Sequence, residues 1–172
     1  MQDNIKLSNL ERKVLDELQK NCRINIDEIG KKCDCSRYKV SRIIKKLEKS
    51  KAIIGYTTAI NPNIINLKYF ILLIKRSSEP LNQNISKHVA MGDFTDLLPE
   101  IDVKIIDTLY LNGYYDFMIT FTTDDITKAK ETYNRLIEIY SKYIDRMELL
   151  ETVIPFRLNG IRIIQPDLAK VL

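Results

Sequence analysis

Residues 35–51, CSRYKVSRIIKKLEKSK, combine a helical repeat of apolar side chains with a high density of positive charge. Val40, Ile44 and Leu47 recur at i, i+4 and i+7, the spacing that brings side chains to one face of an α-helix. Seven lysines and arginines stand in the stretch against a single acid, Glu48. The pattern predicts a helix with one buried side and one cationic side, which needs other helices to cover its apolar stripe.

Local signals place two shorter helices before this one. Ser8 and Glu11 form a capping-box pattern that predicts a first helix from about Asn9 to Lys20. Asn25 can cap a short second helix, and Ser36 can cap the third. Two short helices joined by a tight turn, the second basic outside and apolar inside, are typical of a helix-turn-helix. Glycine 30 lies inside the second helix, which we attribute to the close approach of another helix.

The third helix has the residue types that duplex DNA requires. An α-helix fits the major groove, where residues near its N-terminus reach base edges and lysines neutralise phosphates. The candidates for base or groove-edge contact are Ser36, Arg37, Tyr38, Ser41 and Arg42, and those for phosphate contact are Lys39, Lys45, Lys46 and Lys49. Ile43 either widens the buried stripe or touches a thymine methyl group. The alternative to all of this is a solvated lysine-rich helix without a ligand.

The charge distribution supports a polyanionic partner. The net charge is +4, but residues 1–60 carry 14 Lys/Arg against 8 Asp/Glu, whereas residues 61–172 carry 13 against 15. The positive charge therefore belongs to the first third of the chain. No apolar run approaches the roughly 20 residues of a membrane span, and the first residues lack the apolar core of a signal peptide. We expect a cytoplasmic protein without membrane contact.

The sequence offers little for catalysis or metal binding. Cys22, Cys33 and Cys35 lack zinc-ligand spacing, and His88 is the only histidine, so a zinc site would be short of ligands. Free cysteines near a turn more often pack as small apolar side chains. There is no paired acid–base set, nucleophile elbow or phosphate-binding loop. We expect neither a cofactor nor an enzyme.

The second two-thirds of the chain predict an α/β unit. The predicted elements, in order, are a strand at 68–76, a weak helix from Pro80 to about Leu98 interrupted near Met91 and Gly92, strands at 105–111 and 114–122 joined by a tight Asn112–Gly113 hairpin, a helix capped by Asp124 or Asp125, and a strand at 146–155. The order βαββαβ is the ferredoxin-like arrangement, an antiparallel sheet with helices on one side. Its other face needs a cover, so we expect two chains to pair through their sheets.

These residues resemble the Lrp/AsnC (feast/famine) family of transcription regulators. The resemblance rests on Arg23-Ile24-Asn25, on Val40, Arg42, Ile44, Leu47, Glu48, Ile53, Gly55 and Tyr56, and on the turn Gly113-Tyr114-Tyr115-Asp116. It covers roughly residues 7–155. Two positions depart from the family pattern, which usually has glycine where this chain has Asp34 and Lys51. Two segments depart in length: residues 91–103 are longer than usual, and a tail at 161–172 follows the last strand.

The resemblance implies an α+β protein with an N-terminal helix-turn-helix (winged-helix-like) domain and a C-terminal ferredoxin-like βαββαβ domain. The predicted divisions are 1–51 for DNA binding, 52–66 for a hinge with a strand at 52–61, 67–156 for dimerisation and effector sensing, and 157–172 for an extension. By resemblance, an amino acid or related effector binds near Gly113, Tyr115, Asp116 and Thr152. The alternative for that turn is a simple hairpin with a satisfied acid.

The leading hypothesis is therefore a sequence-specific regulator that binds double-stranded DNA as a homodimer, or as a tetramer or octamer built from dimers, with half-sites about 34 Å or a multiple apart. Two alternatives stay open at this point. One is a small-molecule sensor that acts through protein contacts, and the other is an architectural protein that binds DNA without sequence preference.

Overall fold

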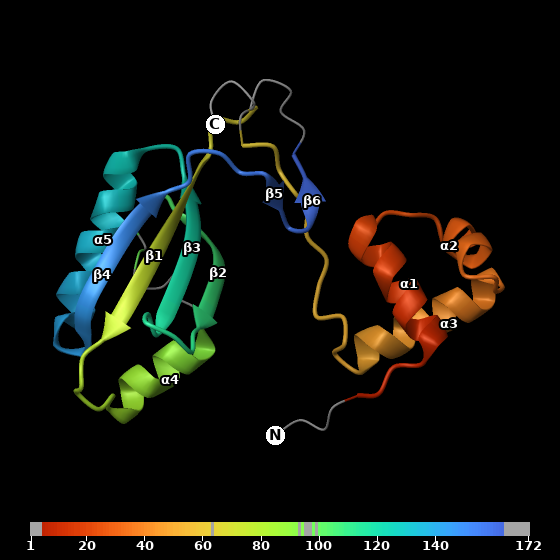
Figure 1. Ribbon diagram of the computed structural model, residues 1–172, viewed down its shortest axis with the longest axis horizontal. Helices are drawn as coiled ribbons and strands as arrows, with labels where there is room; N and C mark the ends of the chain where they lie inside the picture. The colour runs from red at the N-terminus through yellow and green to blue at the C-terminus, as the bar shows by residue number, and fades with distance from the viewer. Residues whose placement is uncertain (1–4, 63, 93, 95–97, 99, 164–172) are drawn as a thin grey trace. The chain divides into compact units, whose positions relative to one another are not determined.

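The computed structural model describes residues 5–62, 64–92, 94, 98 and 100–163, which divide into two compact units. Unit 1 comprises Met1–Ile60 and Phe156–Leu172, and unit 2 comprises Asn61–Pro155. Figure 1 shows the helices of unit 1 in red and orange and the sheet of unit 2 in yellow to blue. No membrane-spanning helix is found in the described part of the chain.

Three helices form the body of unit 1: α1 (Asn9–Lys20), α2 (Ile26–Lys32) and α3 (Arg37–Lys49). Each begins at the predicted cap, because the side chains of Ser8, Asn25 and Ser36 accept a hydrogen bond from a backbone N–H in the first turn. The core is made of one apolar stripe from each helix, and its buried members are Val14, Leu18, Ile29, Cys33, Val40, Ile43 and Leu47. The predicted three-helix unit is confirmed.

The structure settles two open points in this unit. Ile43 is buried in the core, whereas Ile44 is only partly buried, so Ile43 widens the apolar stripe and is not available to a thymine. Gly30 is required by the turn between α2 and α3, since a Cβ there would lie 2.7 Å from the carbonyl oxygen of Cys35. The close approach predicted at Gly30 thus comes from the turn backbone and not from the body of another helix.

Both non-glycine departures from the family pattern have left-handed backbone. Asp34 has φ 52° and Lys51 has φ 59°, which side chains with a Cβ adopt at a cost. Lys51 directly follows the C-cap Ser50 of α3, the position where helices most often carry glycine. The chain keeps the turn geometry that glycine normally supplies and accepts the strain.

Replacing Lys51 with glycine should therefore stabilise unit 1 by about 0.5–1 kcal/mol, the left-handed cost less the greater freedom of glycine in the unfolded chain. Denaturant unfolding followed by circular dichroism measures the gain. The matched control is Lys49→Gly, which lies in the last helical turn of α3 and should lose up to about 1 kcal/mol. Equal effects of the two substitutions would contradict this reading of Lys51.

The segment after α3 is not the predicted strand. Residues 52–61 have no strand pairing, and Ile54 is 93% exposed. The β-branched composition was read as a strand, but pairing needs a partner strand and unit 1 offers none there among its described residues. Contacts within unit 1 do hold the segment, because the Tyr56 hydroxyl donates to Glu48 at 2.9 Å and the Asn159 amide donates to the Thr58 carbonyl at 3.3 Å.

Asn159 belongs to a small hairpin formed by β5 (Arg157–Leu158) and β6 (Ile161–Arg162). Asn159 and Gly160 both have positive φ, as a two-residue hairpin turn of this kind requires. The predicted tail beyond the last strand of the sheet thus begins with a hairpin, and its remainder, residues 164–172, lies outside the described residues.

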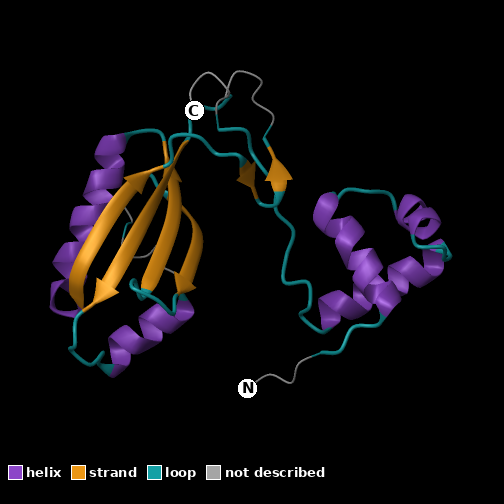
Figure 2. Ribbon diagram, in the orientation of Figure 1, coloured by secondary structure: helices purple, strands orange, loops and turns teal. Residues whose placement is uncertain are grey.

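Unit 2 has the predicted ferredoxin-like order. Its elements are β1 (Lys68–Arg76), α4 (Gln83–Met91), β2 (Lys104–Tyr110), β3 (Phe117–Thr123), α5 (Ile126–Tyr140), the 3-10 turn η2 (Ser141–Tyr143) and β4 (Ile144–Glu151). The strands lie in the order β2-β3-β1-β4 and every pair is antiparallel. Figure 2 shows the four strands in one twisted layer with α5 alongside.

The two faces of this sheet differ. Phe70, Leu72, Ile119 and Phe121 are fully or almost fully buried against α5, which contributes Ala129, Leu136 and Tyr140 to the same core. The residues that alternate with them point to the other face and are only partly covered; they include Tyr69, Ile71, Leu73, Met118 and Leu150. One face is therefore a core, and the other is an apolar surface.

The predicted tight hairpin at Asn112–Gly113 is wrong in detail. Strand pairing ends at Tyr110 opposite Phe117, so residues 111–116 form a six-residue loop. Asp116 closes the loop, because its carboxylate accepts from the Arg76 backbone N–H at 2.9 Å and its own N–H donates to the Ile74 carbonyl at 2.9 Å. These bonds to β1 take the place of ladder pairing that would have brought the strands to the dipeptide.

Candidate nucleic-acid interface

One side of α3 carries a stripe of exposed side chains opposite its buried face. At 100° per residue, Tyr38, Arg42, Lys45 and Lys49 fall within about 60° of one another around the helix, and Val40 and Leu47 lie on the opposite side. All four of the former are exposed, and Tyr38 is 76% exposed. The stripe is about 16 Å long at 1.5 Å per residue. A linear cationic surface of this kind suits the groove and backbone of a duplex.

The cations of this stripe are not neutralised within the chain. Arg42, Lys45 and Lys49 make no ion pair with any described residue, nor does Lys39 on the flank of the helix. Their charge is therefore available to an external anion. Ser41 lies on the other flank and is partly buried.

Three of the sequence-predicted contact residues have structural partners instead of, or besides, an open position. The hydroxyl of Ser36 accepts from the Lys39 N–H at 3.3 Å as the helix cap. Arg37 lies 3.6 Å from the Asp27 carboxylate, and its guanidinium lies 5.8 Å from the centre of the Tyr38 ring. Lys46 pairs with Glu11. Within unit 1, Arg37 and Lys46 are thus tied to α2 and α1.

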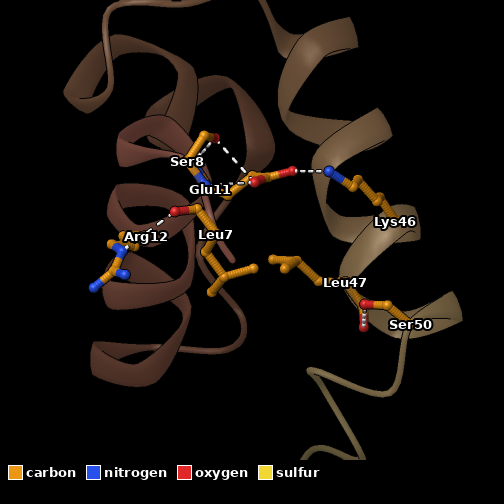
Figure 3. A network of polar contacts seen from close by, with 7 residues as sticks. All are labelled: Leu7, Ser8, Glu11, Arg12, Lys46, Leu47 and Ser50. Carbon is orange, nitrogen blue, oxygen red and sulfur yellow. Dashed lines mark hydrogen bonds and ion pairs between the residues drawn. The ribbon is translucent and has the colours of Figure 1, made fainter. Parts of the chain in front are cut away.

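The Lys46 pair is part of a network that joins α3 to the start of α1 (Figure 3). The ammonium of Lys46 donates to Glu11 Oε1 at 2.5 Å, and the backbone N–H and hydroxyl of Ser8 donate to Glu11 Oε2 at 2.8 and 2.9 Å. The glutamate is only 6% exposed. The sequence indicated the capping box but gave no sign of the link to Lys46, which lies 35 residues away.

The network should make unit 1 sensitive to acid. The Lys46 ammonium, and after it the Ser8 N–H and hydroxyl, lower the pKa of Glu11 from 4.5 to about 2. Because the folded-state pKa is the lower one, the stabilisation is present above pH 4.5 and is lost as the pH falls toward 2. Acid titration of the free energy of unfolding should show a shallower loss in this range for Glu11→Gln, which keeps the capping geometry and removes the charge.

The matched control for this acid titration is Glu131→Gln, an exposed glutamate of α5. It should leave the acid profile of unit 1 as it is in the unmodified chain. An unchanged profile for Glu11→Gln would show that the ion pair with Lys46 contributes nothing to stability.

Three of the four residues predicted for effector binding lie in one loop of unit 2. Gly113, Tyr115 and Asp116 all belong to residues 111–116, and the Tyr115 hydroxyl bonds to Glu148, which raises the tyrosine pKa. Asp116 lies 3.0 Å from the Lys75 ammonium as well as on the Arg76 N–H, and these two partners lower its pKa. Its carboxylate therefore already has partners within the chain.

Thr152, the fourth residue, lies at the other end of the sheet. Its N–H donates to the carbonyl of Tyr69 near the start of β1, whereas Asp116 bonds to Ile74 and Arg76 near the end of that strand. Five residues of β-strand separate Tyr69 from Ile74, or about 16 Å. Within one chain the structure brings Gly113, Tyr115 and Asp116 together and leaves Thr152 apart.

No group of three or more potential metal ligands occurs among the described residues. Cys33 lies buried in the core of unit 1, as expected for a small apolar side chain, and burial raises its thiol pKa.

Comparisons with known proteins agree with both units. Residues 7–53 match the family model described as winged helix-turn-helix DNA-binding. The leucine-responsive regulatory proteins of Escherichia coli K12 and Klebsiella pneumoniae are each 28% identical to the chain over 106 residues, covering 54% of this chain and 65% of the relative. The chain thus aligns with about two-thirds of the length of these relatives.

Solved structures show the same fold along almost the whole chain. An AsnC family transcriptional regulator from Agrobacterium tumefaciens has a TM-score of 0.67 at 18% identity, covering 95% of this chain and 99% of that one. Escherichia coli AsnC has a TM-score of 0.60 at 20% identity, with 94% and 100% covered. The regulator NMB0573 from Neisseria meningitidis, in complex with L-Met, has a TM-score of 0.63 at 14% identity, with 89% and 94% covered. The chain is therefore a relative of the Lrp/AsnC regulators, with a winged helix-turn-helix unit at its N-terminus.

Proposed function

We propose that the chain is a sequence-specific, DNA-binding transcription regulator that acts in the cytoplasm as a homodimer. The observation that carries the proposal is the stripe of Tyr38, Arg42, Lys45 and Lys49, which lies opposite the buried face of α3 and whose cations have no acidic partner among the described residues. The match of residues 7–53 to winged helix-turn-helix DNA-binding domains supports it.

In this proposal α3 enters the major groove with its N-terminal half toward the bases. Tyr38, Ser41 and Arg42 are near enough to the helix start to reach base edges, and Arg42 can donate two hydrogen bonds to a guanine. Lys39, Lys45 and Lys49 contact phosphates and fix the register. Arg37, held by Asp27 and stacked near Tyr38, stiffens the leading end of the helix.

The dimer in this proposal forms through the apolar face of the sheet. Ile71, Leu73 and Met118 are partly covered, and Leu150 is 42% exposed, so a second copy of the same face would bury them all. Two recognition helices then read half-sites about 34 Å or a multiple apart. Tetramers and octamers are further assemblies of such dimers.

The proposal includes a small effector with an amino group, bound at the loop of Gly113, Tyr115 and Asp116. The N. meningitidis regulator of similar fold was solved with L-Met, which supports an amino acid as the chemical class. Since Thr152 lies at the far end of the same sheet, it can join the site only from another copy of the chain. An incoming amino group would also have to displace Lys75 from Asp116.

A binding titration against salt on genomic fragments selected by the full-length protein tests the proposal. With roughly 6–10 phosphate contacts, affinity should fall by about 10³–10⁵ between roughly 50 and 200 mM salt. Footprints should cover defined sites in the selected fragments and none in random DNA of equal length. Salt-independent binding would refute the proposal, and equal binding to random DNA would favour an architectural protein.

A further inference from the structure

A cavity of about 60 Å³ lies inside unit 2, on the helix side of the sheet where β1 ends. Aliphatic side chains from residues 81–89 form one wall, among them Leu81, Ile85 and Val89. Aromatic rings form the other wall and pack edge to face, with Phe94 5.7 Å from Phe117 and 6.4 Å from Tyr140 between ring centres. The cavity does not touch the loop of Gly113, Tyr115 and Asp116.

The only charged group in this lining is Arg76, the last residue of β1. Its Nε is buried and has no hydrogen-bond partner among the described residues. One terminal nitrogen of the guanidinium reaches the Glu79 carbonyl at 3.5 Å, the outer limit of a hydrogen bond. The edge of the guanidinium formed by Nε and a terminal nitrogen, which carboxylates bind with two parallel bonds, thus lacks a good acceptor.

A buried donor without an acceptor is costly, so an anion at this edge would be favoured. The cavity has room for roughly four to six water-sized groups, and its remaining lining is apolar apart from tyrosine hydroxyls. No aspartate or glutamate lines it, so an ammonium group would be desolvated there without a counter-charge. These features select a small anion with an apolar body and without an amino group.

We propose that this cavity binds a small monocarboxylate with a short branched hydrocarbon body, its carboxylate on the Nε edge of Arg76 and its hydrocarbon between α4 and the aromatic wall. The site is distinct from the amino-acid site of the proposed function and does not depend on DNA binding. Because the Arg76 N–H also holds the Asp116 carboxylate, an occupant of the cavity lies beside the strand end that anchors the 111–116 loop.

The test uses the full-length protein with 3-methylbutanoate, its neutral isostere 3-methylbutanamide, and leucine, observed through the methyl NMR signals of Ile85 and Val89. The carboxylate should bind with a Kd in the millimolar range or tighter and shift both residues. The amide should bind about 10- to 100-fold more weakly, because it lacks the charge that Arg76 recognises. Leucine should not shift these methyl groups at equal concentration.

Variants separate the charge from the space. Arg76→Gln keeps the backbone N–H to Asp116 and should weaken the carboxylate by the same factor as the amide exchange. Ile85→Phe leaves Arg76 in place, fills the cavity and should abolish binding. Arg135→Gln, on the exposed side of α5 and paired with Glu138, is the matched control and should bind as the unmodified chain does.

Circular dichroism melts check that each variant is folded, and the comparison of acid and amide on the unmodified chain needs no variant. Equal affinity for the acid and the amide, shifts of these methyl groups by leucine as large as those by the acid, or unchanged methyl signals with all three compounds would overturn the proposal. Loss of DNA binding is not a readout here, so either outcome leaves the DNA-binding proposal standing.

Discussion

Replacing Arg42 and Lys45 together with alanine should lower the affinity for duplex DNA by about 100-fold at physiological salt, the sum of one lost base contact of about 1–3 kcal/mol and one lost phosphate contact. Both side chains are exposed on the stripe opposite Leu47 and make no ion pair among the described residues. Their removal should leave the core of unit 1 intact. The physical cause is the loss of two cations that neutralise the duplex, so the dependence of affinity on salt should also become shallower by about 1–2 in the logarithmic slope.

Fluorescence anisotropy with a selected fragment, at several salt concentrations, measures both quantities. The matched control is Lys87→Ala with Lys130→Ala, which removes the same charge from exposed positions of α4 and α5 in unit 2. It should change affinity by less than about threefold, since it alters only the long-range field. Comparable losses in the two double variants would mean that net charge, and not the stripe on α3, determines binding.

Replacing Leu47 with alanine should destabilise unit 1 by about 2–5 kcal/mol, the usual range for a buried leucine. Leu47 is fully buried where α3 packs against the other two helices, and its carbonyl accepts the Ile53 N–H just after α3. The substitution leaves a cavity that helices held at both ends can close only in part. As small domains have marginal stability, much of the population of unit 1 would unfold and DNA binding would fall with it.

The chain has two units, so a single unfolding curve need not describe both. Amide NMR signals of unit 1 and unit 2, followed separately against denaturant, assign the loss to the correct unit. Ile54→Ala is the control, because Ile54 is 93% exposed, and it should cost less than about 0.5 kcal/mol. A small loss for Leu47→Ala in unit 1 would contradict the packing described here.

Local signals predicted unit 1 well because caps and apolar repeats act over a few residues. Ser8, Asn25 and Ser36 all cap helices, and the buried face of α3 follows from its repeat. The role of Lys46 could not be predicted in this way. Its position on the outer flank of α3 suggested a phosphate contact, but its partner Glu11 comes from a different helix.

Pairing over long distances explains the errors in unit 2 and the hinge. Asn112–Gly113 is a good two-residue turn, yet Asp116 bonds to β1 and ends the pairing earlier. The β-branched segment at 52–61 has strand composition without a partner strand. Thr152 was grouped with Asp116 by resemblance, and only the register of β1 with β4 places them at opposite ends of the sheet.

The central claim, that α3 reads the major groove, is tested most directly by methylation interference on a selected fragment. Dimethyl sulfate methylates guanine N7 in the major groove and adenine N3 in the minor groove, so the two grooves are scored on one DNA. Guanine N7 methylation within two half-sites should block binding, with the sites about one helical turn or a multiple apart. Binding that is blocked only by adenine N3 methylation, or by neither, would contradict a recognition role for α3.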